Sequence, residues 1–271
     1  NYENMLVKLV NTNACNGCNL IGVNLSNVDL TGKNLSNADF SGSYLANKNF
    51  SGSDLTGSIF YGADFEGTIL TGTTLTGSNL TNVNLNQAKG YNGNVNDFTN
   101  FNFSTVNLSN SNLANSNLTN STLTYANILG ANLTGVNFTN TTDLKQTAGN
   151  NGALGNFAGF NFSGANLTGN NLSSVNFTNA NLSGANLYTA NLTSSILTNA
   201  NLSGATLTYA NILGAALTGA NFNNAKDLKQ TAGNNGALGN FAGFNFSNAN
   251  LTGNNLSYAN FSNANLSGAN L

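Results

Sequence analysis

The chain has 271 residues, 6% of them are charged, and its formal net charge is −2. Nucleic-acid binding depends on a dense basic surface, and seven scattered Lys residues do not supply one, so we expect no nucleic-acid partner. The chain has no His, which removes the commonest general base and a common metal ligand. We therefore expect no enzyme, no cofactor and no metal site. No stretch of eighteen apolar residues occurs, so we also expect no membrane span.

Residues 1–14 predict an N-terminal capping helix. Met5, Leu6, Leu9 and Val10 recur at helical spacing and would form one apolar side. The open end of a stack of repeats exposes apolar interior and unpaired backbone edge. We expect the apolar side of this helix to cover that end.

A repeat of five residues begins near Cys15 and continues to Leu271. It is clearest over residues 160–222, where every fifth residue is Leu, Ile or Phe. Asn usually precedes this central residue, and Ser or Thr and then Gly or Asn usually follow it, as in residues 165–169. A period of five fits neither a helix nor a simple strand, so it indicates a repeat architecture.

This unit closely resembles that of the pentapeptide-repeat family. The resemblance implies an all-β fold, a right-handed quadrilateral parallel β-helix in which four units form one square coil. Residues one coil apart then stack at about 4.8 Å, which gives a solenoid roughly 60 Å long. Two buried core columns are predicted from this spacing: Leu20, Phe40, Phe60 and Leu80, and Phe162, Leu182, Leu202 and Phe222.

Cys15 and Cys18 are the only cysteines. They lie five and two residues before the central Leu20, so both should face the interior of the first coil. Two ligands are too few for a zinc site, which leaves a structural disulfide or two buried thiols. The order of a short helix and then Cys-x-x-Cys-Asn-Leu resembles exported cyanobacterial-type members of the family. That resemblance implies export, to a periplasm, a thylakoid lumen or the outside of the cell.

The repeat is interrupted near 86–97, 139–161 and 223–245. Residues 122–177 match residues 206–261 at an offset of 84 positions, so the second and third interruptions are copies of one another. We expect one solenoid over residues 15–271 with three irregular loops, which form the least regular surface of the molecule.

Lys33 and Lys48 each stand two residues before a centre, where small inward residues belong. We expect both side chains to turn outward at a corner. The Asp residues of the first run each precede a centre, but their spacing puts them on four different faces, so no acidic ladder of the kind a DNA mimic needs is expected. These residues are Asp29, Asp39, Asp54 and Asp64.

The chain stops at Leu271, within a repeat unit. We expect Leu266 and Leu271 to contact Leu6, Leu9 and Val10 of the next copy, and a head-to-tail contact that does not close gives a filament. The leading prediction is therefore a non-enzymatic, exported structural solenoid that assembles into an extracellular filament. The alternatives are a protein-interaction scaffold that binds through its loops and, third, a DNA-mimicking gyrase inhibitor.

Overall fold

A computed structural model describes residues 2–271, with the backbone alone described for Tyr2. Asn1, which belongs to the predicted cap 1–14, lies outside the described residues. The chain divides into two compact units, the first ending at Asn132 and the second spanning Leu133–Leu271. The single solenoid over 15–271 stays a prediction.

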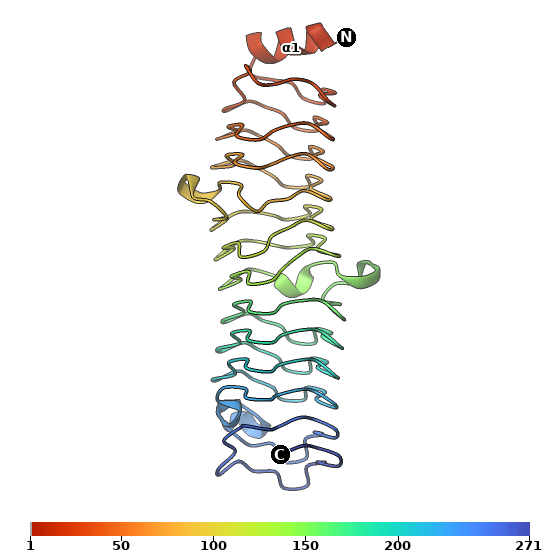
Figure 1. Cartoon of the computed structure of the whole chain (residues 1–271), viewed down its shortest axis with the longest axis vertical. Helices are drawn as coiled ribbons and strands as arrows, with labels where there is room; N and C mark the ends of the chain where they lie inside the picture. The colour runs from red at the N-terminus through yellow and green to blue at the C-terminus, as the bar shows by residue number, and fades with distance from the viewer. Residues whose placement is uncertain (1) are drawn as a thin grey trace. The chain divides into compact units, whose positions relative to one another are not determined.

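The N-terminal helix is present as α1, Tyr2–Asn11, and it lies at the open end of the first coils (Figure 1). Leu9 is fully buried, and Met5 and Leu6 are partly buried. Val10 is 61% exposed, so its predicted place on the covered side of the helix is wrong. Each residue of a helix is turned by about 100° from the one before it, which carries Val10 off the side that holds Leu9.

Within each unit the chain winds in coils whose parallel bridges join residues one coil apart. In the first unit these include Asn19 with Asp39 and Asp39 with Ile59, and in the second they include Asn161 with Asn181. The bridges are isolated pairs, so the described residues contain no extended strand. As far as Leu251 the central residue of each repeat points inward and is buried, and the rings of Phe40 and Phe60 stack with centroids 4.9 Å apart.

The residues around each centre form the corner of the coil. The second residue after the centre has a positive φ, as in Gly42 (64°) and Asn37 (58°), because the corner is a turn of the type that needs left-handed backbone there. The Asn or Asp before the centre accepts a hydrogen bond from a backbone N–H two residues later, as Asn181 does from Ser183 (3.0 Å). This explains why Asn, Gly and hydroxyl residues recur at fixed places in the unit.

Three loops leave the coils, and each is closed by an antiparallel bridge at its base (Figure 1). A glycine at the base is required, because a Cβ on Gly149 would lie 2.0 Å from the backbone oxygen of Asn156. The loops contain all of the short 3-10 helices of the described residues: η1 (Tyr91–Gly93), η2 (Leu144–Gln146), η3 (Asn150–Gly152), η4 (Leu228–Gln230) and η5 (Asn234–Gly236).

Candidate functional site

The hydrogen-bonded ladder of the first unit is interrupted where residues 22–30 face residues 42–50. At many other places the centre N–H donates to the coil above, as Leu20 does to Asp39 (2.8 Å) and Leu35 to Asp54 (2.8 Å). Among the described residues, no backbone hydrogen bond joins 22–30 to 42–50, and the bridges expected between Asn24 and Tyr44 and between Asp29 and Asn49 are missing. We call this break the opening.

Lys48 lies at the opening and takes a position that holds Ser or Thr in several other repeats of the first unit. The hydroxyls of Ser43, Ser53 and Thr68 each donate to the carbonyl 23 residues earlier, in the coil below. The Lys48 ammonium donates to the equivalent carbonyl, that of Leu25. Since a lysine side chain is much longer than that of serine, filling this position with lysine separates the two backbones. The break is one-sided, because Ile69 in the coil above still donates to the Lys48 carbonyl (2.8 Å).

The predicted outward turn of Lys33 and Lys48 is therefore wrong. Lys33 is 8% exposed, and its ammonium donates to the carbonyl of Thr12 at 3.4 Å. In both cases a backbone carbonyl of the preceding layer lies within reach of the ammonium. A charge-assisted hydrogen bond from the ammonium to that carbonyl replaces some of the water molecules that would hydrate the ammonium if the side chain pointed to solvent.

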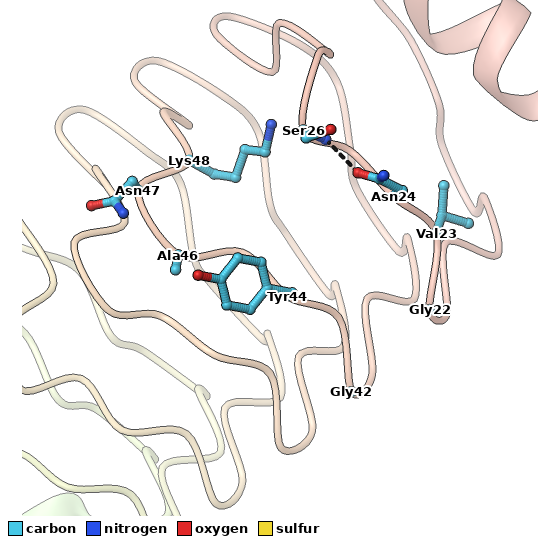
Figure 2. A pocket seen from close by; sticks show the side chains of 9 residues that line it. All are labelled: Gly22, Val23, Asn24, Ser26, Gly42, Tyr44, Ala46, Asn47 and Lys48. Atoms are coloured by element: carbon cyan, nitrogen blue, oxygen red, sulfur yellow. Dashed lines mark hydrogen bonds between the residues drawn. The ribbon is translucent and has the colours of Figure 1, made fainter.

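A hollow of about 580 Å³ lies at the opening. Figure 2 shows the Lys48 side chain reaching from its own coil toward the segment that carries Ser26, with Tyr44 beside it. The Tyr44 side chain is 74% exposed. The hollow therefore combines an ammonium, an accessible ring and two backbone edges whose N–H and C=O groups do not pair with each other. Its lining residues are Gly22, Val23, Asn24, Ser26, Gly42, Tyr44, Ala46, Asn47 and Lys48.

Two ionisable groups at the opening have shifted pKa values. Desolvation by burial lowers the pKa of the Lys48 ammonium. The pKa of the Asp29 carboxyl is lowered chiefly by hydrogen bonds from the side chain and the backbone N–H of Thr31, with a smaller contribution from Lys33. The opening therefore holds a cation that gains from a further hydrogen-bond acceptor.

The predicted core columns lie buried inside the coils. Leu20, Phe40, Phe60 and Leu80 stack through successive backbone hydrogen bonds, and each is 0% exposed. In the second unit the same holds for Phe162, Leu182, Leu202 and Phe222. These residues shape the coil and present no chemistry at its surface.

Cys15 and Cys18 are both buried, and their two Sγ atoms are in close contact with each other. Their Cα atoms are 5.3 Å apart. That separation suits a disulfide. The covalent bond itself stays a prediction. Thiol counting on the denatured, unreduced protein tests it, because two titratable thiols would contradict the bond.

The residues predicted for an end-to-end contact differ in exposure. Leu9 is fully buried, so its predicted part in such a contact is wrong, because the side chain is already covered within its own unit. Leu6 and Leu266 are partly buried, whereas Val10 and Leu271 are exposed. The contact itself stays a prediction.

The loops of the second unit do not share a face. The loop within 139–161 leaves the face of Phe157 and Phe177, and the loop within 223–245 leaves the neighbouring face of Leu192 and Ile212. The loop within 86–97 belongs to the first unit. Two loops on neighbouring faces do not offer one continuous docking surface.

The described residues contain no group of three or more His, Cys, Asp or Glu side chains placed to hold a metal ion. Asp29, Asp39, Asp54 and Asp64 precede centres of four different columns. Over residues 2–271, no helix has the length and apolar character needed to cross a bilayer.

A family model described as pentapeptide repeats matches the chain in eight copies. The chain belongs to the pentapeptide-repeat family. Members of this family are generally non-enzymatic structural or interaction proteins. The matched residues are 18–57, 34–72, 58–89, 68–95, 102–140, 156–188, 185–224 and 240–271.

Solved structures of the same family are similar to this chain. They include HetL, a pentapeptide repeat protein involved in heterocyst differentiation regulation from Nostoc, with 24% identity over 77% of this chain and 92% of that one, at a TM-score of 0.27. A thylakoid-lumen member from Arabidopsis thaliana is 32% identical over 41% of this chain and 68% of that one, at a TM-score of 0.22.

The fluoroquinolone resistance protein QnrB1 is 16% identical over 73% of this chain and 87% of that one, at a TM-score of 0.26. These low TM-scores carry no argument, so the family assignment rests on the repeats. No curated protein matches the sequence.

Sequence reasoning singled out Lys48 but missed the opening. The sequence does contain a sign of the opening, because Lys48 replaces the small inward residue that usually stands two positions before a centre, and it does so above a complete coil. What the repeat could not give was the direction of the side chain.

Proposed function

We propose that this protein is a non-catalytic interaction scaffold, a right-handed four-sided coil that binds an extended peptide segment of a partner protein at the opening. The observation that carries the proposal is the break between residues 22–30 and 42–50, beside a hollow that contains Lys48. Extended peptides bind to unpaired sheet edges through main-chain hydrogen bonds, while side-chain pockets supply specificity.

The edges of the opening supply such groups. On one side the N–H groups of Leu25 and Leu30 make no bond of the kind that the neighbouring centres Leu20 and Leu35 make to the coil above, and on the other side the Tyr44 and Asn49 carbonyls do not accept one. Lys48 adds a cation for a peptide carbonyl or carboxylate, and exposed Tyr44 adds a ring to pack against.

The test is selection of peptides from a displayed random library on the intact protein, followed by titration of the enriched peptides. A matched pair of variants decides the site. Lys48→Ser should weaken binding at least tenfold, because it restores the small inward residue and closes the opening. Lys33→Ser, at the other lysine of this type, should leave binding unchanged. Failure to enrich any peptide, or equal binding by Lys48→Ser and the unaltered protein, would contradict the proposal.

Export and end-to-end assembly into a filament remain a second proposal, supported by the resemblance of the Cys15–Leu20 segment to exported members. Electron microscopy of the purified chain tests assembly, and isolated particles at high protein concentration would count against it. The gyrase-inhibitor alternative has the least support, because the acidic residues are spread over four faces. A supercoiling assay in which the protein inhibits gyrase at low concentration would reverse that order.

A further inference from the structure

We infer that the second unit carries a binding site for an extended chain of neutral sugar rings, along an edge formed by Tyr188, Tyr209 and Tyr258. We call these three residues the tyrosine edge. They are 42%, 49% and 105% exposed. This site lies on different residues from the opening and does not depend on the proposed peptide binding.

The three tyrosines follow one another along the direction in which the coils stack. The rings of Tyr188 and Tyr209 contact each other edge to face, with centroids 6.0 Å apart. The Tyr209 N–H donates to the Gln230 carbonyl (3.1 Å), and Gln230 lines the same hollow as Tyr258. Tyr209 and Tyr258 are therefore two coils apart, a rise of about 10 Å. A straight chain of sugar rings matches such a line, because it presents ring faces at regular intervals.

A hollow of about 300 Å³ lies at the Tyr258 end of this edge. It is lined by Lys229, Gln230, Leu238, Gly239, Ser257, Tyr258 and Ala259. The apolar part consists of the Tyr258 ring and the Leu238 side chain, which is 50% exposed, and the amide and hydroxyl groups of Gln230 and Ser257 lie beside them. An apolar face flanked by hydroxyl and amide groups is the chemistry that a sugar ring requires of its site.

Two of the charges near the edge, those of Lys229 and Asp227, already have partners. The Lys229 ammonium donates to the Ser257 hydroxyl (3.1 Å), and the Thr208 hydroxyl donates to the Asp227 carboxylate (2.6 Å). What remains for a ligand is a set of rings, hydroxyls and amides. A neutral polyhydroxyl ligand fits this set better than a charged peptide.

The internal duplication supplies a comparison within the same unit. Residues 143–163 and 227–247 have the same sequence. The two copies differ farther along the chain, where Ser174 and Val175 of the first correspond to Tyr258 and Ala259 of the second. A Cβ on Gly155 would lie 3.5 Å from a Val175 methyl, so that methyl packs against the loop, whereas the smaller Ala259 leaves space. The second copy therefore has both a ring and a hollow where the first has a hydroxyl and a methyl group.

The experiment is calorimetric titration of the intact chain with four neutral hexasaccharides: cellohexaose, laminarihexaose, maltohexaose and N-acetylated chitohexaose. We expect at least one to bind. Tyr258→Ser should weaken that binding about tenfold, as the loss of one stacking ring predicts. This variant carries the residue that the first copy tolerates, so it should fold. Tyr209→Ala should weaken binding to a similar extent.

Tyr61→Ala is the control, since Tyr61 is 52% exposed in the first unit and should not affect sugar binding. Binding of none of the hexamers, or equal affinity for Tyr258→Ser and the unaltered protein, would overturn the inference. Peptide binding measured on the same Tyr258→Ser sample should be unchanged, so failure here is distinguishable from failure of the proposed function.

Discussion

Lys33 and Lys48 occupy the same position of the repeat, two residues before a centre, yet the ladder is intact at one and broken at the other. Around Lys33, Asn34 is bridged to Ala14 and to Asp54. Below Lys48, no backbone hydrogen bond joins 22–30 to 42–50 in the described part of the chain.

The difference lies in what is beneath each side chain. Lys33 reaches Thr12, in the turn just after α1, where no repeat coil lies below it. Lys48 stands above a full coil and reaches Leu25 within it. A long inward side chain is therefore compatible with the ladder at the end of the stack, but within the stack it separates two coils.

The strongest test of this comparison transplants the lysine. Ser53 donates to the Leu30 carbonyl in the same way that Lys48 donates to Leu25. Ser53→Lys should open the ladder between Asn34 and Asp54 and lower the free energy of unfolding by about 2–3 kcal/mol, because it overpacks a closed position. Chemical denaturation measures this. Ser53→Ala is the control and should cost about 1 kcal/mol, the loss of one hydrogen bond.

Removing the lysine from the opening should change the free energy of unfolding in the opposite direction. Lys48→Ser should raise the free energy of unfolding by about 1–2 kcal/mol, because closure of the opening adds several backbone hydrogen bonds. Denaturation in urea measures the change. A destabilised Lys48→Ser protein would show that Lys48 fills a gap which exists for another reason.

At the end of the stack the effect should be small. Lys33→Ser removes an ammonium from the C-terminal end of α1, where cations are favourable, and should cost about 0.5 kcal/mol. The loss should appear as fraying of the helix in circular dichroism, with the coils unchanged. A loss as large as that for Ser53→Lys would contradict the distinction between the two sites.

The smallest expected effect is a dependence of stability on pH. The folded-state pKa of Lys48 lies below its ordinary value of 10.5. Between these two pKa values the unfolded chain binds the proton more strongly than the folded chain, so the free energy of unfolding should rise as pH increases through that window. Lys48→Ser should lack this rise, which paired denaturation curves at several alkaline pH values would detect. A Lys48→Ser protein that keeps the same rise would assign it to another group.

Much of the architecture could be predicted from the sequence, because the repeat leaves few choices. A Leu or Phe every fifth residue has to point inward, and an Asn or Gly two residues later fits the left-handed corner. The direction of the lysines could not be predicted, because it depends on a carbonyl in another coil and on the spacing between coils. The exposure of Val10 depends on how α1 sits on the first coil, which a helical period alone does not determine.

The tyrosine edge could not be predicted for a related reason. Tyr188, Tyr209 and Tyr258 are 21 and 49 residues apart, and neither spacing is a multiple of twenty. The inserted loop between 223 and 245 shifts the register, so only the structure brings Gln230 next to both Tyr209 and Tyr258.

The most direct test of the opening is amide hydrogen exchange on the unaltered protein and on Lys48→Ser. Because their N–H groups make no bond across the opening, Leu25, Leu30 and Asn49 should exchange at least tenfold faster than Leu35 and Asp54 in the unaltered protein. In Lys48→Ser the first three should slow to the rate of the other two. Equal protection of both sets in the unaltered protein would contradict the opening and, with it, the proposed binding of an extended peptide.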